Sequence, residues 1–198
     1  MPQSVTLILA STSPYRRQLL QRLGVPFEVC APEVDETPLP GELPPQRAAR
    51  LAAAKTRAVA ITHPNAIVIG SDQVASLGDG AAARILRKPG GRERCLAQLA
   101  ELSGRVARFD TAVCLAWPGG GWAAHTDITR VVFRALSAAE IERYVEREPA
   151  FDCAGGFKCE GLGVSLMQGI ESTDPTALIG LPLIWLSNAI RGSGLSIP

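Results

Sequence analysis

Leu7-Ile8-Leu9-Ala10-Ser11-Thr12-Ser13-Pro14-Tyr15-Arg16-Arg17 joins an apolar run to a segment with the marks of a helix start. The run Leu7–Ala10 predicts a buried strand, because it is short, apolar and bounded by small hydroxyl residues. Ser13 can cap the helix that follows. Pro14 suits the first helical position, where no backbone donor is missed. A strand that turns directly into a helix indicates an α/β fold.

The same segment also has the chemistry of an anion site. Arg16 and Arg17 fall in the first helical turn, where the helix dipole disfavours cations. Free N–H groups, hydroxyls and guanidinium groups gathered at one place can bind phosphate. The alternative is an ordinary capped helix with two solvated arginines, which is common in α/β proteins.

Composition limits the class of protein. The chain of 198 residues is long enough for one domain over residues 1–198, and its net charge of +1 argues against broad nucleic-acid binding. No apolar stretch approaches the roughly 20 residues of a membrane span, and no signal peptide is visible. We therefore expect a cytoplasmic protein with no membrane partner. Five cysteines without a C-x-x-C pair argue against a disulfide framework or a zinc ribbon.

Helical and strand patterns alternate along the chain without a clear linker. The expected helices are 14–23, 46–61, 92–102, 138–148, 175–179 and 182–190, and the expected strands are 7–10, 26–30, 65–70, 106–117 and 122–133. The chain has neither a P-loop pattern nor a G-x-G-x-x-G after its first strand. These absences argue against a P-loop NTPase and a Rossmann dinucleotide site.

Four charged residues are candidates for chemistry. Asp72 follows the apolar strand 65–70, where it could hold Mg²⁺ or position a water, although aspartate often only forms a turn there. Glu33 lies in a proline-rich loop and is either a second functional carboxylate or a solvated residue. Lys55, on an alanine-rich helix, fits a solvated helix face better. Lys88 precedes a proline in a glycine-rich loop and could swing onto a phosphate.

An ordered set of blocks gives the chain a family resemblance. They are APEVDET (31–37), RLAAAKTRA (50–58), IGSDQV (69–74), RKP (87–89), CAGGFKCEGLG (153–163) and DPTALIGLPL (174–183). With the opening segment they resemble the Maf family of nucleotide pyrophosphatases, and STSPYRR resembles the subgroup that acts on 7-methyl-GTP. The resemblance implies a Maf/ITPase-like α/β fold, in which helices flank an elongated, twisted mixed sheet and two lobes enclose a central cleft.

The resemblance also implies roles for particular residues. It makes Asp72 the catalytic proton acceptor. It assigns substrate binding to Ser11, Arg16, Glu33, Lys55 and Lys88. It assigns base preference to Tyr15, Gln73 and Glu160. Glu33 and Asp72 would hold a divalent cation, which is Mg²⁺, Mn²⁺ or Co²⁺.

The implied reaction is hydrolysis of a modified nucleoside triphosphate, 7-methyl-GTP, to the monophosphate and pyrophosphate. The resemblance implies that the protein removes modified nucleotides in the cell. The family is also linked to arrest of cell division, and it suggests a homodimer. Alternatives are another base preference (dTTP/UTP or ITP) and a nucleotide-binding regulator of septation without turnover. Three departures from the family pattern are Tyr15 for tryptophan, Arg87 before Lys88 where glycine is common, and the insert 78–84.

Overall fold

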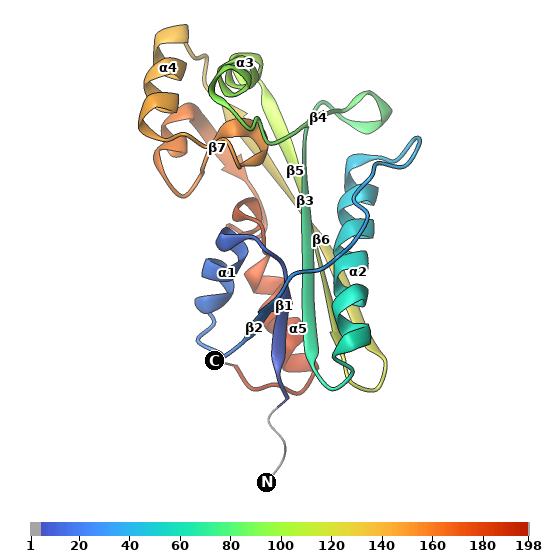
Figure 1. Ribbon diagram of the computed structural model, residues 1–198. Coiled ribbons are helices and arrows are strands. Elements are labelled where there is room, and N and C mark those ends of the chain that lie inside the picture. Colours follow the sequence, from blue (N-terminus) through green and yellow to red (C-terminus); the bar gives the residue numbers. More distant parts are fainter. Residues whose placement is uncertain (1–4, 198) are drawn as a thin grey trace.

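A single mixed β-sheet runs the length of the molecule in the computed structural model, which describes residues 5–197 (Figure 1). The strands are β1 (Leu7–Ala10), β2 (Glu28–Cys30), β3 (Ile67–Leu77), β4 (Arg84–Leu86), β5 (Val106–Trp117), β6 (Gly121–Phe133) and β7 (Met167–Glu171). The α-helices are α1 (Pro14–Gln21), α2 (Pro44–Thr62), α3 (Arg92–Leu102), α4 (Ala138–Arg147) and α5 (Leu183–Gly192). Short 3₁₀ turns are η1 (Gly80–Ala82), η2 (Ala154–Gly156), η3 (Leu162–Leu166) and η4 (Ala177–Ile179).

The sheet has seven strands in the order β2-β1-β3-β5-β6-β7, and β4 adds to β3 off this path. β1 is parallel to β2 and β3, and the other pairs are antiparallel. In Figure 1, α1, α2 and α5 accompany the end of the sheet that holds β1 and β2, while α3 and α4 gather at the other end. The expected α/β architecture, a twisted mixed sheet flanked by helices, is confirmed. No helix among residues 5–197 is long and apolar enough to cross a membrane.

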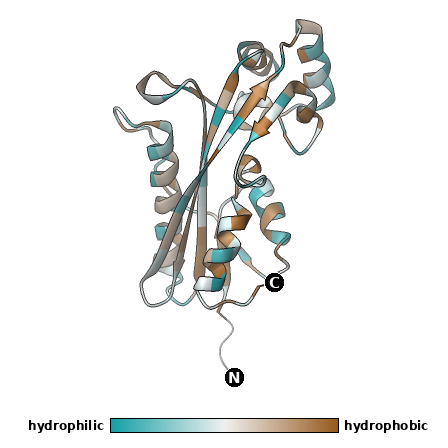
Figure 2. Ribbon diagram, turned by 180° about the vertical axis from the view of Figure 1, so that it is seen from behind, coloured by the Kyte–Doolittle hydropathy of each residue, from teal (hydrophilic) through white to brown (hydrophobic). Residues whose placement is uncertain are grey.

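Alternating side chains divide the first half of the sheet between two layers of helices. Residues of β1, β3 and β5 with odd numbers, such as Leu9, Ile69 and Leu115, pack with α1 and α5. Their even-numbered neighbours, such as Ile8 and Val68, pack with α2. This two-residue period is what a strand buried on both faces requires. Seen from behind in Figure 2, the helices carry both hydrophilic and hydrophobic residues, as expected for helices with one buried side.

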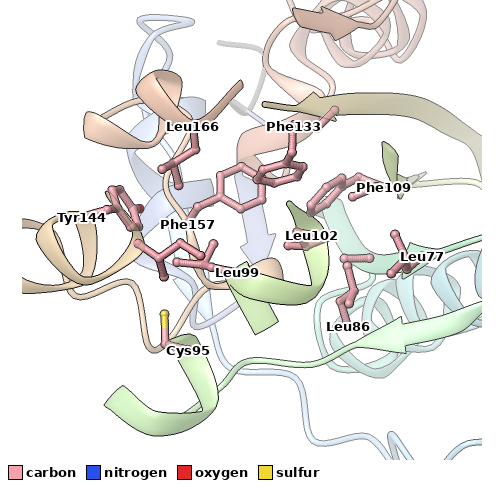
Figure 3. Packing of buried hydrophobic residues seen from close by; sticks show 14 of the residues in the cluster. Leu77, Leu86, Cys95, Leu99, Leu102, Phe109, Phe133, Tyr144, Phe157 and Leu166 are labelled. Carbon is pink, nitrogen blue, oxygen red and sulfur yellow. The ribbon is translucent and has the colours of Figure 1, made fainter. Parts of the chain in front are cut away.

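A separate core closes the other end of the sheet. Phe157 lies between Phe109 and Phe133, with ring centroids 5.7 and 5.2 Å away and both pairs edge to face (Figure 3). Leu99 of α3 and Tyr144 of α4 belong to the same cluster. Phe157 follows the Gly155-Gly156 turn, so its burial fixes the segment 152–160 against this end of the sheet.

The structure corrects the expected position of Asp72. The strand predicted to end at residue 70 continues to Leu77, so Asp72 lies within β3 and not after it. β5 is the cause, because it pairs with β3 from Val68↔Ala116 to Leu77↔Ala107 and extends the strand beyond its apolar run. Two strands, β4 and β7, were not predicted, because each is short and mostly exposed.

Gly70 marks a close approach between β3 and α2. A Cβ atom at this position would meet the Thr56 hydroxyl and lie 2.7 Å from the backbone oxygen of Ala52 and the backbone nitrogen of Thr56. Because backbone atoms cannot turn aside, we expect Gly70→Ala to lower the free energy of unfolding by about 3 kcal/mol. Urea unfolding measures the change.

Gly169→Ala is the matched control, since an added methyl group there has no atom within 4 Å. We expect the control to unfold at nearly the wild-type urea concentration. Equal stability of Gly70→Ala and wild type would show that α2 does not need to approach β3 so closely.

Candidate active site

A break in strand pairing opens the sheet at its centre. β1 pairs with β3 as far as Ala10↔Gly70, and β4 begins only at Ala75↔Leu86. Within residues 5–197, no strand pairs with residues 71–74 on that edge of β3. A cavity of about 620 Å³ lies against this free edge. A ligand in it can therefore reach side chains from both faces of the sheet.

The β1–α1 turn forms one wall of the cavity. Ser13 caps α1 as predicted, with its hydroxyl accepting from the Arg16 backbone N–H at 3.4 Å. The buried Ser11 hydroxyl accepts from the Ser13 N–H at 3.1 Å. Both serines line the cavity. These bonds fix the turn beside the cavity, and the backbone N–H groups at a helix start can bind an anion.

Arg16 reaches back from α1 to the loop before α5. Its Nε donates to the Gly180 carbonyl at 2.9 Å, and the same oxygen accepts from the Ser71 hydroxyl at 3.0 Å. Burial lowers the pKa of Arg16, and the negative charges of Asp72 and Glu36 act in the opposite direction. The guanidinium is thus held in place as a fixed cation lining the cavity.

Lys55 and Asp72 form a buried ion pair in the wall of the cavity. The Lys55 Nζ lies 2.6 Å from Asp72 Oδ1, and the two residues are only 8% and 9% exposed. The same ammonium lies 2.8 Å from Glu36 Oε1. This hydrogen bond is the main cause that lowers the pKa of Glu36. A lysine between two carboxylates, inside a cavity, is ready to exchange one of them for a phosphate oxygen.

Glu33 does not take part in this cluster. It is exposed on the loop before α2 and is not among the residues that line the cavity, whereas Glu36 is. The block Ala31–Thr37 contains three carboxylates, and sequence alone had no means of choosing between them. The distinguishing feature is the contact with Lys55, which lies 19 positions further along the chain and on another element.

Arg47 is a second lining residue that the sequence did not single out. It lies in the first turn of α2, and its Nη2 donates to the Glu36 carbonyl at 3.1 Å. Its Nε is a buried donor with no hydrogen-bond partner among the described residues. An unused donor beside an anion cavity is suited to a ligand oxygen.

Lys88 lines the cavity from the loop that follows β4, next to Arg87. Both side chains are exposed. Lys88 is therefore free to adjust to a ligand. The cavity thus has cations on several sides, contributed by α1, α2 and the β4 loop.

Gln73 points to the other face of β3 from Asp72. Its Nε2 donates to the Thr111 hydroxyl at 2.9 Å and to the carbonyls of Ala177 and Leu178 at 3.1 and 3.0 Å. Among the hydrogen bonds of the described residues, its Oε1 accepts none. Gln73 is therefore held by its nitrogen and can offer an oxygen to donors on a ligand.

Tyr15 and Glu160 line the cavity from two segments that are distant in the sequence. The Tyr15 hydroxyl donates to Asp152 Oδ2 at 2.9 Å, and the Lys158 ammonium lies 5.6 Å from the centre of its ring. Glu160 is exposed. Tyr15, Gln73 and Glu160 thus all line the cavity, although they come from three separate segments.

Comparison with known proteins identifies the family of the chain. The family model described as "Maf-like protein" matches residues 6–193. A 7-methyl-GTP pyrophosphatase of Xanthomonas campestris pv. campestris is 56% identical over 192 residues, which are 97% of this chain and 98% of the relative. The corresponding protein of Xanthomonas oryzae pv. oryzae is 58% identical with the same coverage, and that of a Polaromonas species is 51% identical over 99% of this chain and 88% of the relative. The chain therefore belongs to the Maf family.

Proposed function

We propose that this protein is a nucleoside triphosphate pyrophosphatase that hydrolyses 7-methyl-GTP to 7-methyl-GMP and pyrophosphate. The main support is the cluster of Lys55, Asp72 and Glu36 inside a cavity lined by further cations. Close relatives named for this activity match nearly the whole chain. A protein that only bound nucleotides would have less need of a carboxylate base among the phosphate contacts.

The buried carboxylate of Asp72 is the proposed base. Asp72 accepts a proton from a water that attacks the α-phosphorus, and the bond between the α-phosphorus and the bridging oxygen breaks. Pyrophosphate leaves with that oxygen. Lys55, Arg16 and Lys88 stabilise the charge that develops on the phosphate oxygens. The unused Nε donor of Arg47 is placed for the same task.

A divalent cation fits the carboxylates present. Asp72 and Glu36 converge on one ammonium group, so they can converge on one metal ion, and Mg²⁺ commonly takes one or two carboxylates together with substrate phosphates. Residues 5–197 contain no ready group of three or more metal-ligating side chains. The ion would therefore be bound jointly with the nucleotide. When bound, it neutralises phosphate charge and polarises the phosphorus.

The base is proposed to lie among Tyr15, Gln73 and Glu160. Methylation of guanine at N7 gives the ring a positive charge, which an aromatic face and a carboxylate both favour. The Gln73 Oε1 and the Glu160 carboxylate can accept hydrogen bonds from the N–H groups of the base. A site built from such acceptors disfavours a base that leaves them unpaired.

A substrate panel tests this function. We expect the protein with Mg²⁺, Mn²⁺ or Co²⁺ to cleave 7-methyl-GTP with a higher kcat/KM than GTP, dTTP, UTP or ITP, and to lose turnover when EDTA removes the metal. Mass spectrometry identifies the products, and cleavage in ¹⁸O-water locates the attacked phosphorus. Label in the monophosphate is the expected result. Nucleotide binding without products, under all three metals, would instead identify a regulator.

A further inference from the structure

Tyr15 of α1 contacts two residues of the segment 152–160, which packs against the other end of the sheet. It lies in the first turn of α1, whereas Asp152 and Lys158 flank the Gly155-Gly156 turn that is anchored in the core around Phe157. The tyrosine hydroxyl donates to Asp152, and the lysine ammonium faces the tyrosine ring. A tryptophan at position 15 has no hydroxyl for this bond. The arrangement is therefore a property of the tyrosine found here.

Tyr15, Asp152 and Lys158 combine a neutral donor, an anion and a cation. Burial raises the pKa of Tyr15, and the neighbouring Cys153 and Asp152 raise it further, so the hydroxyl remains a donor. Burial acts to raise the pKa of Asp152, but the bond from Tyr15 and the charge of Lys158 outweigh it and lower the pKa. Asp152 thus lies at the hydroxyl end of the Tyr15 side chain, and Lys158 lies over the face of its ring. Stacking on that ring face would displace the cation.

We propose that Asp152, Lys158 and Tyr15 form a cation-exchange site for the base, in which Lys158 is an internal competitor and Asp152 discriminates between substrates. The positively charged ring of 7-methylguanine takes the place of the Lys158 ammonium on the face of Tyr15. Asp152 then serves as counter-charge to the base. This inference rests on the proposed function, because it assumes that the base stacks on Tyr15.

The preference between bases depends on the charges that remain beside Tyr15 after Lys158 has been displaced. Every base that stacks on Tyr15 displaces Lys158, so that loss is common to all substrates. A neutral guanine then leaves the Asp152 carboxylate without a nearby cation. A methylated guanine restores the cation and also regains the attraction of the ring. Asp152 therefore sets the preference, and Lys158 sets how tightly any base binds.

Two variants separate these roles. Asp152→Asn keeps an acceptor for the Tyr15 hydroxyl but removes the charge, and we expect the ratio of kcat/KM for 7-methyl-GTP over GTP to fall about 2- to 5-fold, the range for an exposed charge pair. Lys158→Met removes the competitor while keeping a long side chain. We expect it to tighten the Kd of 7-methyl-GMP and of GMP by a similar factor, about 2- to 5-fold, without changing their ratio.

The controls are Glu142→Gln and Arg143→Met, which alter exposed charges on α4 in the same half of the molecule. We expect both to behave as wild type in the nucleotide assays. Calorimetry gives the Kd values, and thermal melting confirms that each variant is folded. Higher ionic strength should reduce the wild-type preference, because it screens the exposed Asp152.

The outcomes distinguish this inference from the proposed function. A wild-type protein with no preference for 7-methyl-GTP would overturn both. A wild-type preference that Asp152→Asn leaves intact would overturn the cation-exchange site alone. The same holds if Lys158→Met weakens nucleotide binding, because the lysine would then contact the nucleotide directly. If Asp152→Asn unfolds, Tyr15→Phe removes the hydroxyl that holds the Asp152 carboxylate beside the ring, and it is expected to lower the preference as well.

Discussion

Asp72→Asn is expected to lower kcat/KM for 7-methyl-GTP by about 10²–10⁴-fold, the usual contribution of a general base. Asparagine has nearly the same volume but cannot take a proton from water. Since β3 is paired with β5 from Val68 to Leu77, the backbone at Asp72 should not move. Steady-state kinetics with purified variant and wild type give the ratio.

Asp110→Asn is the matched control for this experiment. Asp110 is also buried in the sheet, where both of its carboxylate oxygens accept hydrogen bonds from Arg108, and it does not line the cavity. We expect the control to lower stability and to retain kcat/KM. Near-normal turnover of Asp72→Asn, with an unchanged melting temperature, would remove Asp72 from the mechanism.

Lys55→Met is expected to lower kcat/KM by about 10²–10³-fold, as for the loss of a fixed donor to a developing oxyanion. The variant removes the cation that lies between Asp72 and Glu36, so it also leaves a buried carboxylate unpaired. The pKa of Glu36 should rise toward its ordinary value, because its main cause of lowering is gone. Activity should be measured well below the melting temperature, which is expected to fall.

The double variant Lys55→Met/Asp72→Asn separates the two effects. Removing the unpaired charge should restore part of the lost stability without restoring turnover. Lys88→Ala is the comparison for a lysine on the surface, and it should change stability by less than about 0.5 kcal/mol while still weakening turnover. If Lys55→Met keeps its kcat/KM and only melts earlier, Lys55 is a structural residue.

The sequence predicted those parts of the fold that depend on local pattern. Ser13 was recognisable as a cap, and residues 106–117 and 122–133 as two long strands. α2 begins at Pro44, two residues earlier than expected, because prolines are tolerated in a first turn. The family assignment was also accessible, because it rests on the order of several short blocks.

The site depended on contacts between distant segments, which local pattern does not contain. Lys55 fits a solvated helix face by its alanine-rich surroundings, yet it is buried because Asp72 and Glu36 meet it there. The position of Asp72 within a strand follows from the length of β5. No sequence pattern marked Lys158 as a site residue, since its contact with Tyr15 depends on the fold, which places α1 beside the segment 152–160.

The free edge of β3 exposes both faces of the sheet to one ligand, so phosphate hydrolysis and base recognition can use different residues. Lys55 and Asp72, proposed for hydrolysis, meet on the α2 face of the sheet, whereas Gln73, proposed for base recognition, points to the other face. Substitutions in the segment 152–160 can therefore change which nucleotide is accepted while Asp72 and Lys55 stay in place.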